Sequence, residues 1–93
     1  MKFYGSLISI TKIKELNLVI EKAQLLLKEL ILNLSKKFGT DFKKYVLTED
    51  EKKIPPFLII LINEISVDLL NYLNTNLKNN DIITFLPSIH GGF

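Results

Sequence analysis

A change in the spacing of apolar residues constrains the fold of this chain more than any other feature. Between Lys22 and Phe38, apolar side chains recur every three or four residues, which places them along one side of an α-helix. They are Ala23, Leu26, Leu27, Leu30, Ile31, Leu34 and Phe38. Lys36 and Lys37 would complement the dipole of the last turn, and Gly39 is suited to end the helix. We therefore predict one core helix over residues 22–38, packed across a sheet.

The residues before this helix have the pattern of two β-strands. Lys2–Ile10 is apolar with interspersed serine and glycine, and residues 16–20 place leucine or isoleucine at every second position. We predict that these two strands pair antiparallel through a turn at Thr11–Glu15. The first strand is shorter if Tyr4–Leu7 marks its end.

The segment after the helix is mostly polar. Over residues 40–53 we predict a short helical turn followed by a loop. Glu49, Asp50 and Glu51 form an acidic run in this loop, but no further ligand or catalytic base lies near them in the sequence. A solvated loop therefore explains the run better than a carboxylate site does.

The second half of the chain is predicted to supply the remaining strands. Ile54-Pro55-Pro56 makes a rigid extended entry into Phe57–Ile62, an apolar strand expected to be buried on both faces. Asn63-Glu64 is predicted to form a turn, and Ile65–Leu77 a short strand followed by irregular or single-turn structure. Lys78–Asp81 is predicted to form a second turn, because Asn and Asp tolerate left-handed conformations and bond to their own backbone.

The last stretch combines a strand with a slender end. Ile82–Phe85 is rich in branched and aromatic residues, which favour a strand. Pro87 has no amide N–H, so the sheet ladder should end near it and the chain should leave the fold. Gly91 and Gly92 lack a Cβ atom, which would let residues 88–93 act as a slim, flexible tail that enters narrow places. We predict that this terminus is the working part of the molecule.

Composition excludes several kinds of chemistry. The 93 residues contain no cysteine and a single histidine, His90, which excludes disulfides, thiolate catalysis and any metal site with sensible Cys or His spacing. A net charge of +2 from scattered lysines does not indicate nucleic acid binding. The length and the 47% apolar fraction fit one globular domain over residues 1–93. No apolar run is long enough to span a bilayer and no leader opens the sequence, so we expect a cytoplasmic protein.

The predicted order of elements is that of the ubiquitin-like β-grasp fold, an α+β fold in which a mixed sheet of four to five strands packs on one main helix. A more specific resemblance is carried, in order, by Phe3-Tyr-Gly-Ser-Leu7, Lys37-Phe38-Gly39, Pro56–Asn63, Leu77–Asp81 and the Phe-Leu-Pro…Gly-Gly ending at 85–92. Over nearly its whole length the chain resembles the MoaD/ThiS sulfur-carrier proteins. Its length is closer to the small subunit of molybdopterin synthase (MoaD) than to the shorter thiamine carrier. The His-Gly-Gly ending also resembles eukaryotic and archaeal ubiquitin-related modifiers.

The resemblance implies a substrate protein that has no catalytic constellation and no bound cofactor of its own. In such carriers a partner adenylating enzyme (MoeB/ThiF-like) uses ATP to activate the carboxylate of the second glycine, and a sulfur donor then makes a thiocarboxylate. Carried over to this sequence, Gly92 would be the reactive residue, with Gly91 before it. The resemblance places partner binding at Phe85, Pro87, Ile89 and His90, with Phe85 and Ile89 as exposed apolar contacts. A large catalytic subunit (MoaE-like) would be a further partner in molybdopterin synthesis.

Besides the short first strand, the sequence departs from the family pattern at its end and in two turns, and the departure at its end leaves the function open. Phe93 follows the glycine pair, so either a peptidase removes it or the chain is not a working carrier. Asn63-Glu64 and Asn79-Asn80 stand where many relatives have glycine in a turn, which asparagine tolerates. The first class of function is a sulfur carrier for molybdopterin synthesis, with tRNA thiolation or protein conjugation as the alternative within that class. The second class is a non-catalytic β-grasp interaction module with an inert terminus.

Overall fold

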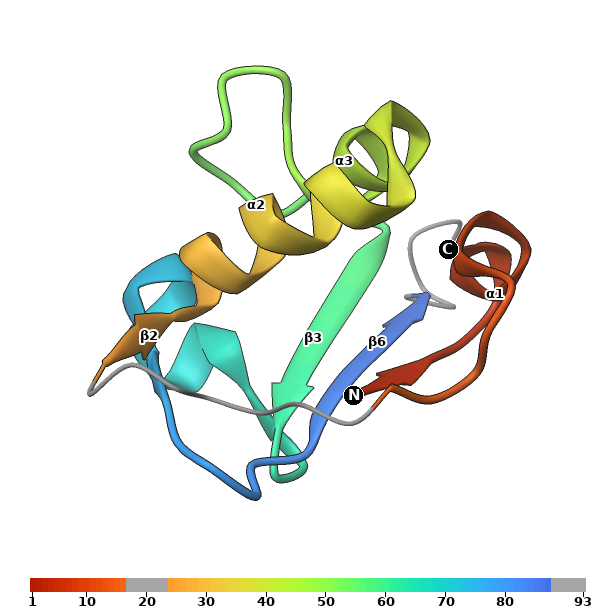
Figure 1. The fold of residues 1–93 in the computed structure, drawn as a ribbon. Coiled ribbons are helices and arrows are strands. Elements are labelled where there is room, and N and C mark those ends of the chain that lie inside the picture. The colour runs from red at the N-terminus through yellow and green to blue at the C-terminus, as the bar shows by residue number, and fades with distance from the viewer. Residues whose placement is uncertain (17–23, 88–93) are drawn as a thin grey trace.

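The computed structural model describes residues 1–16 and 24–87, and Figure 1 shows their arrangement. A four-stranded sheet has the order β1-β6-β3-β4, and β2 pairs with β5 in a separate two-stranded sheet. The strands are β1 (Lys2–Phe3), β2 (Leu25–Leu26), β3 (Leu58–Ile62), β4 (Ile65–Ser66), β5 (Asn76–Leu77) and β6 (Ile83–Pro87). The helices are α1 (Ser6–Thr11), α2 (Leu27–Phe38) and α3 (Thr40–Val46), with short 3-10 helices η1 (Val67–Leu69) and η2 (Tyr72–Asn74).

Strand β6 lies in the middle of the main sheet. It runs parallel to β1, with Phe85 opposite Phe3, and antiparallel to β3, with Phe85 opposite Ile60. Helices α2 and α3 lie on one side of this sheet (Figure 1). The predicted last strand, its end at Pro87 and the predicted β-grasp fold are therefore confirmed.

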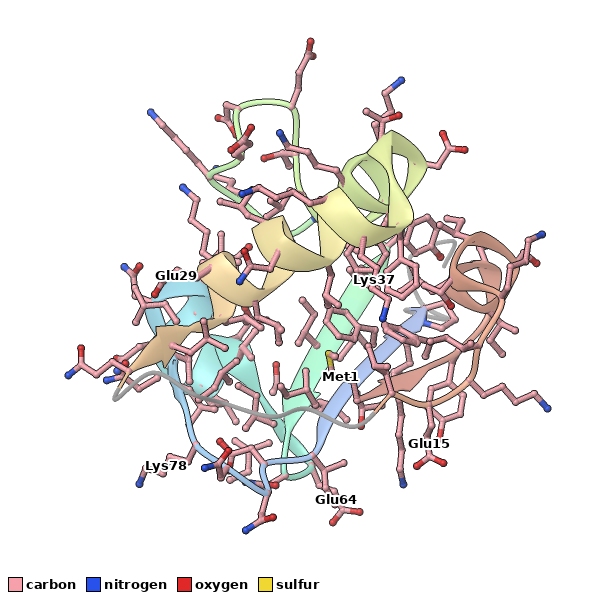
Figure 2. The ribbon with its side chains drawn as sticks, viewed as in Figure 1. Met1, Glu15, Glu29, Lys37, Glu64 and Lys78 are labelled. Carbon is pink, nitrogen blue, oxygen red and sulfur yellow. The ribbon has the colours of Figure 1, made fainter. Side chains whose placement is uncertain are left out.

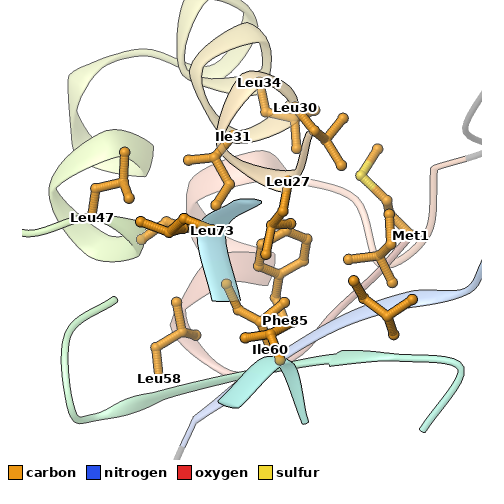
Figure 3. Packing of buried hydrophobic residues seen from close by; sticks show 14 of the residues in the cluster. Met1, Leu27, Leu30, Ile31, Leu34, Leu47, Leu58, Ile60, Leu73 and Phe85 are labelled. Carbon is orange, nitrogen blue, oxygen red and sulfur yellow. The ribbon is translucent and has the colours of Figure 1, made fainter. Parts of the chain in front are cut away.

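The core fills the space between α2 and the inner face of the sheet (Figure 3). Helix α2 contributes the buried residues Leu27, Leu30, Ile31 and Leu34. In β3 only alternate residues, Leu58, Ile60 and Ile62, are fully buried, whereas Ile59 and Leu61 are partly exposed on the outer face. The prediction that this strand is buried on both faces is wrong, because the described helices pack on the inner side alone.

Helix α2 begins at Leu27, later than the predicted start. Leu25 and Leu26 are extended because they pair with Leu77 and Asn76 of β5. The Glu29 carboxylate accepts a hydrogen bond of 3.1 Å from the amide of Leu26, which marks the helix start. Residues 22 and 23 of the predicted helix lie outside the described residues. The predicted apolar side and the end at Gly39, whose φ is +96°, are confirmed.

The predicted strand over residues 2–10 is wrong beyond Phe3. Gly5 has a φ of +61°, which turns the chain into α1 and buries the Leu7 side chain completely. The shorter alternative, in which Tyr4–Leu7 marks the end of the strand, agrees with the structure, where β1 ends at Phe3. Lys2 pairs antiparallel with Glu15 in one isolated bridge, so the two N-terminal segments do run antiparallel, joined by a helix rather than a tight turn. Leu16 is not in a strand, and residues 17–20 lie outside the described residues.

The predicted turns are confirmed, but the extended entry predicted at residues 54–56 is wrong, because the amide of Leu58 donates a 3.0 Å hydrogen bond to the carbonyl of Pro55 and the chain turns just before β3. Asn63 and Glu64 form the β3–β4 turn with φ values of +51° and +71°. In the turn at residues 78–81, the carboxylate of Asp81 accepts a 2.8 Å hydrogen bond from the Lys78 amide. Charged side chains at these turns, Glu64 and Lys78 among them, point outward from the ribbon (Figure 2). None of the helices in the described ranges is long and apolar enough to cross a membrane.

Candidate functional site

The candidate site is the root of the C-terminal tail, which we define as the end of β6 at Leu86–Pro87 and the residues beside it. Ile83 and Phe85 of β6 point into the core, whereas Thr84 and Leu86 face outward. Phe85 has an exposed fraction of 0%, and its ring stacks on that of Phe3 at a centroid distance of 5.5 Å. The expectation that Phe85 is an exposed partner contact is therefore wrong, because the strand alternation turns this residue inward.

Hydrogen bonding between β1 and β6 ends at Pro87. The amide of Tyr4 donates a 3.0 Å bond to the carbonyl of Phe85. A parallel ladder of this register would next receive a bond from the amide of residue 87, and proline has no N–H to donate. On its other side Pro87 lies opposite Leu58 of β3. The proline therefore closes the ladder on the β1 side at the point where the tail begins.

Gly5 lies directly beside this proline. A Cβ atom built on Gly5 would stand 3.1 Å from Pro87 Cγ and 3.3 Å from Pro87 Cδ, which is tighter than nearly all real contacts of a Cβ atom. The backbone of Gly5 also has a φ of +61°, which favours glycine. Sequence reasoning singled out Tyr4-Gly5 only as a marker of the strand end, because nothing local in the sequence shows that residues 5 and 87 meet.

The outer face of the sheet along β6 carries both apolar and polar side chains, some of them well exposed. Tyr4 and Ile82 are 46% and 49% exposed, and a shallow hollow of about 480 Å³ lies over the same strands. Its lining comes from β1, β3, the β3–β4 turn and β6: Lys2, Tyr4, Leu61, Asn63, Glu64, Ile82, Thr84 and Leu86. The sequence analysis did not predict this surface. The alternation of Ile82, Thr84 and Leu86 with buried residues is the sequence signal that indicates it.

The remaining predicted site residues can be placed only in part. Pro87 is half-buried and lies at the root, as described above. Ile89, His90, Gly91 and Gly92 lie outside the described residues, so their roles stay predictions.

The acidic run at residues 49–51 lies on a surface loop and forms no catalytic cluster. The hydroxyl of Thr48 donates to Asp50 and holds the pKa of that carboxyl below its ordinary value. Lys43 Nζ lies 2.6 Å from Glu51 Oε2 and lowers the pKa of Glu51 in the same way. Within residues 1–16 and 24–87, no group of three or more His, Asp or Glu side chains could hold a metal ion. This result agrees with the interpretation of the run as a solvated loop.

Comparison with known proteins shows the family. The model of the family described as Urm1 (Ubiquitin related modifier) matches residues 2–92. The ubiquitin-related modifier 1 homolog of Bombyx mori is 36% identical over 66 residues, which are 71% of this chain and 59% of that protein. The aligned region therefore spans under two thirds of the length of the curated relative.

Solved structures agree with this result. The solution structure of small archaeal modifier protein 1 (SAMP1) from Methanosarcina acetivorans has a TM-score of 0.78 and 29% identity, and the match covers 98% of this chain and 92% of that one. The crystal structure of Urm1 from Sulfolobus solfataricus has a TM-score of 0.69 and 25% identity, with 94% and 96% covered. These similarities favour the ubiquitin-related modifiers, the alternative in the sequence analysis, over the molybdopterin-synthase subunit. The chain belongs to the Urm1 family, the ubiquitin related modifiers.

Proposed function

We propose that this protein is a ubiquitin-related modifier whose terminal carboxylate, on Gly92 after removal of Phe93, is activated by an adenylating enzyme and then carries sulfur. The observation that carries the proposal is the family match over residues 2–92, which takes in both glycines and leaves Phe93 outside. Strand β6 ends at Pro87, ahead of both glycines, which supports delivery of the terminus to a partner's active site.

The chemistry needs little from the carrier itself. The carboxylate of Gly92 would attack the α-phosphorus of ATP, releasing pyrophosphate and forming an acyl-adenylate. A sulfur nucleophile supplied by a donor would then attack the acyl carbon and displace AMP, which leaves a thiocarboxylate. ATP is thus a substrate of the partner, and the carrier holds no cofactor. The chain has no cysteine with which it could hold the sulfur in another way.

The outer sheet face is the proposed docking surface for the adenylating enzyme. Leu86 lies on β6, which leads into the tail, and Ile82 directly precedes this strand, so a partner that binds this face would extend to the tail root. Tyr4 adds a large, half-exposed aromatic side chain from the neighbouring segment, and aromatic residues of this kind are enriched at binding hot spots. Lys2 and Glu64 line the same hollow and would orient the partner through charged contacts.

Intact-mass measurement tests the proposal. The purified chain ending in Gly92 would be incubated with its adenylating enzyme, ATP and a sulfide source, beside the chain ending in Phe93. We expect the mass of the shorter chain to rise by the difference between sulfur and oxygen, and the mass of the longer chain to stay unchanged. Activation of the longer chain would refute the removal of Phe93, and activation of neither chain would refute the carrier function.

The downstream use of the sulfur is the finer question. Thiolation of tRNA or conjugation to proteins is the use that the family match favours. Delivery to molybdopterin, through a MoaE-like large subunit, is the alternative that the sequence resemblance raised. Loss of thiolated tRNA nucleosides after gene deletion, with molybdoenzyme activity retained, would support the first use, and the reverse phenotype would support the second.

A further inference from the structure

We propose that Gly5 is a positioning residue. Because it has no side chain, the ring of Pro87 packs close to its backbone, and this packing fixes the point at which the tail leaves the sheet. The role of Gly5 rests on the proposed function, since it concerns how the tail reaches the adenylating enzyme. Gly5 itself would touch neither ATP nor the reacting carboxylate.

The pairing of β1 with β6 places these two residues side by side. Lys2 lies opposite Thr84 and Phe3 opposite Phe85, and the same parallel register extended by two residues brings Gly5 opposite Pro87. At this point β1 ends and the chain turns into α1, whose first residue is Ser6. The start of α1 and the start of the tail are therefore held at one corner of the sheet.

The contact between the two residues is close and depends on both. The 3.1 Å and 3.3 Å separations from Pro87 Cγ and Cδ leave no room for a side chain at position 5 without a shift of the ring. Proline restricts its own φ to a narrow range, so a ring held against Gly5 also restricts the direction of the backbone that follows. Leu58 confines Pro87 from the other strand. Gly5 and Leu58 thus fix the position of Pro87, the last described residue before the tail.

Orientation of the tail matters because adenylation requires the carboxylate to meet the α-phosphorus of ATP in line. Small errors in the placement of reacting groups reduce rates strongly, even when the change lies far from the chemistry. A displaced tail root would therefore lower kcat, whereas the affinity of the docking face, which has its own side chains, would hardly change.

The test uses Gly5→Ala, with Gly39→Ala as the matched control. Both glycines have positive φ, at +61° and +96°, but a Cβ atom on Gly39 would meet nothing within 4 Å. In ATP–pyrophosphate exchange by the adenylating enzyme, we expect Gly5→Ala to lower kcat by ~10-fold or more at nearly constant KM. Gly39→Ala should leave both kcat and KM unchanged, because this substitution also strains a backbone of positive φ but its new methyl group contacts no neighbouring residue.

A double-mutant cycle with Pro87→Ala separates the contact between Gly5 and Pro87 from a general effect on folding. Removing Cγ and Cδ of the proline makes room for the new methyl group, so the double variant should be no slower than Pro87→Ala alone. Equal kcat for Gly5→Ala and the unmodified protein, or additive losses in the cycle, would overturn the role of Gly5. All variants are made in the chain ending in Gly92, and failure of the enzyme to activate that chain with Gly5 in place would instead refute the proposed function, and the role of Gly5 with it.

Discussion

Replacing Phe85 with alanine tests whether the central strand is anchored by this ring or presents it to a partner. The ring is fully buried, stacks on Phe3 and meets Phe42 edge-on at 6.3 Å between centroids. Truncation to alanine removes about 150 Å² of buried apolar surface, which at ~25 cal/mol/Å² corresponds to ~4 kcal/mol. Measured costs of Phe→Ala in protein cores, about 3–5 kcal/mol, agree with this value.

The assay is urea unfolding followed by circular dichroism, with Ile82→Ala as the control on the same segment. Ile82 is 49% exposed on the outer face, so its truncation should cost less than about 1 kcal/mol. For a domain of this size, the loss at Phe85 should lower Tm by roughly 15–30 °C. A cost of Phe85→Ala below about 1 kcal/mol would refute the assignment of this ring to the core and restore it as a candidate partner contact.

Three further outcomes are expected. Leu30→Ala should lower the free energy of unfolding in urea by about 2–5 kcal/mol, because Leu30 lies on the buried side of α2. The control Leu69→Ala, at an 80% exposed position, should lower it by less than about 0.5 kcal/mol. Equal losses for the two variants would contradict the burial of Leu30. The Glu51 carboxyl should titrate below its ordinary pKa, so its contribution to stability is present above that ordinary value and is lost as the pH falls through the lowered one. Replacing Lys43 by methionine should raise the pKa of Glu51 in an NMR titration, and an unchanged pKa would exclude the ion pair as its cause. Gly92→Ala should leave Tm unchanged and abolish thiocarboxylate formation as measured by intact mass, because the new Cβ atom would prevent the tail from entering a narrow site of the partner enzyme. Normal thiocarboxylate formation would contradict this requirement for glycine.

The parts of the fold that local chemistry determines could be predicted from the sequence. Asp81 marks a turn because its carboxylate accepts a 2.8 Å hydrogen bond from the amide of Lys78, three residues earlier. Asn63 marks a turn because asparagine tolerates its φ of +51°. Pro87 marks the end of a ladder because it lacks an N–H. These signals act within a few residues or through backbone chemistry alone, so they do not depend on the rest of the chain.

The errors occurred where tertiary contacts decide between helix and strand. Leu7 and its apolar neighbours fit either structure, and the turn at Gly5 selects the helix. Leu25 and Leu26 fit the helical period but are extended because β5 pairs with them. The inward direction of Phe85 follows from the register of β6 against two strands that are distant in sequence. The choice between carrier families could not be made from the glycine pair alone, because the relatives considered share both the fold and the ending.

The alternation along β6 separates stability from recognition on a single strand. Inward residues such as Phe85, whose ring contacts Phe42 of α3, hold the sheet to the helices. Outward residues such as Leu86 contribute little to the free energy of unfolding and belong to the proposed docking face. Substitutions at Leu86 should therefore change the KM for the adenylating enzyme at nearly constant Tm, and those at Phe85 should change Tm first. Pro87, at the end of the same strand, belongs to neither group, since it contacts Gly5 and directs the tail. A ubiquitin-related modifier with this alternation can vary its outer sheet face without loss of the fold, provided that the corner formed by Gly5 and Pro87 is kept.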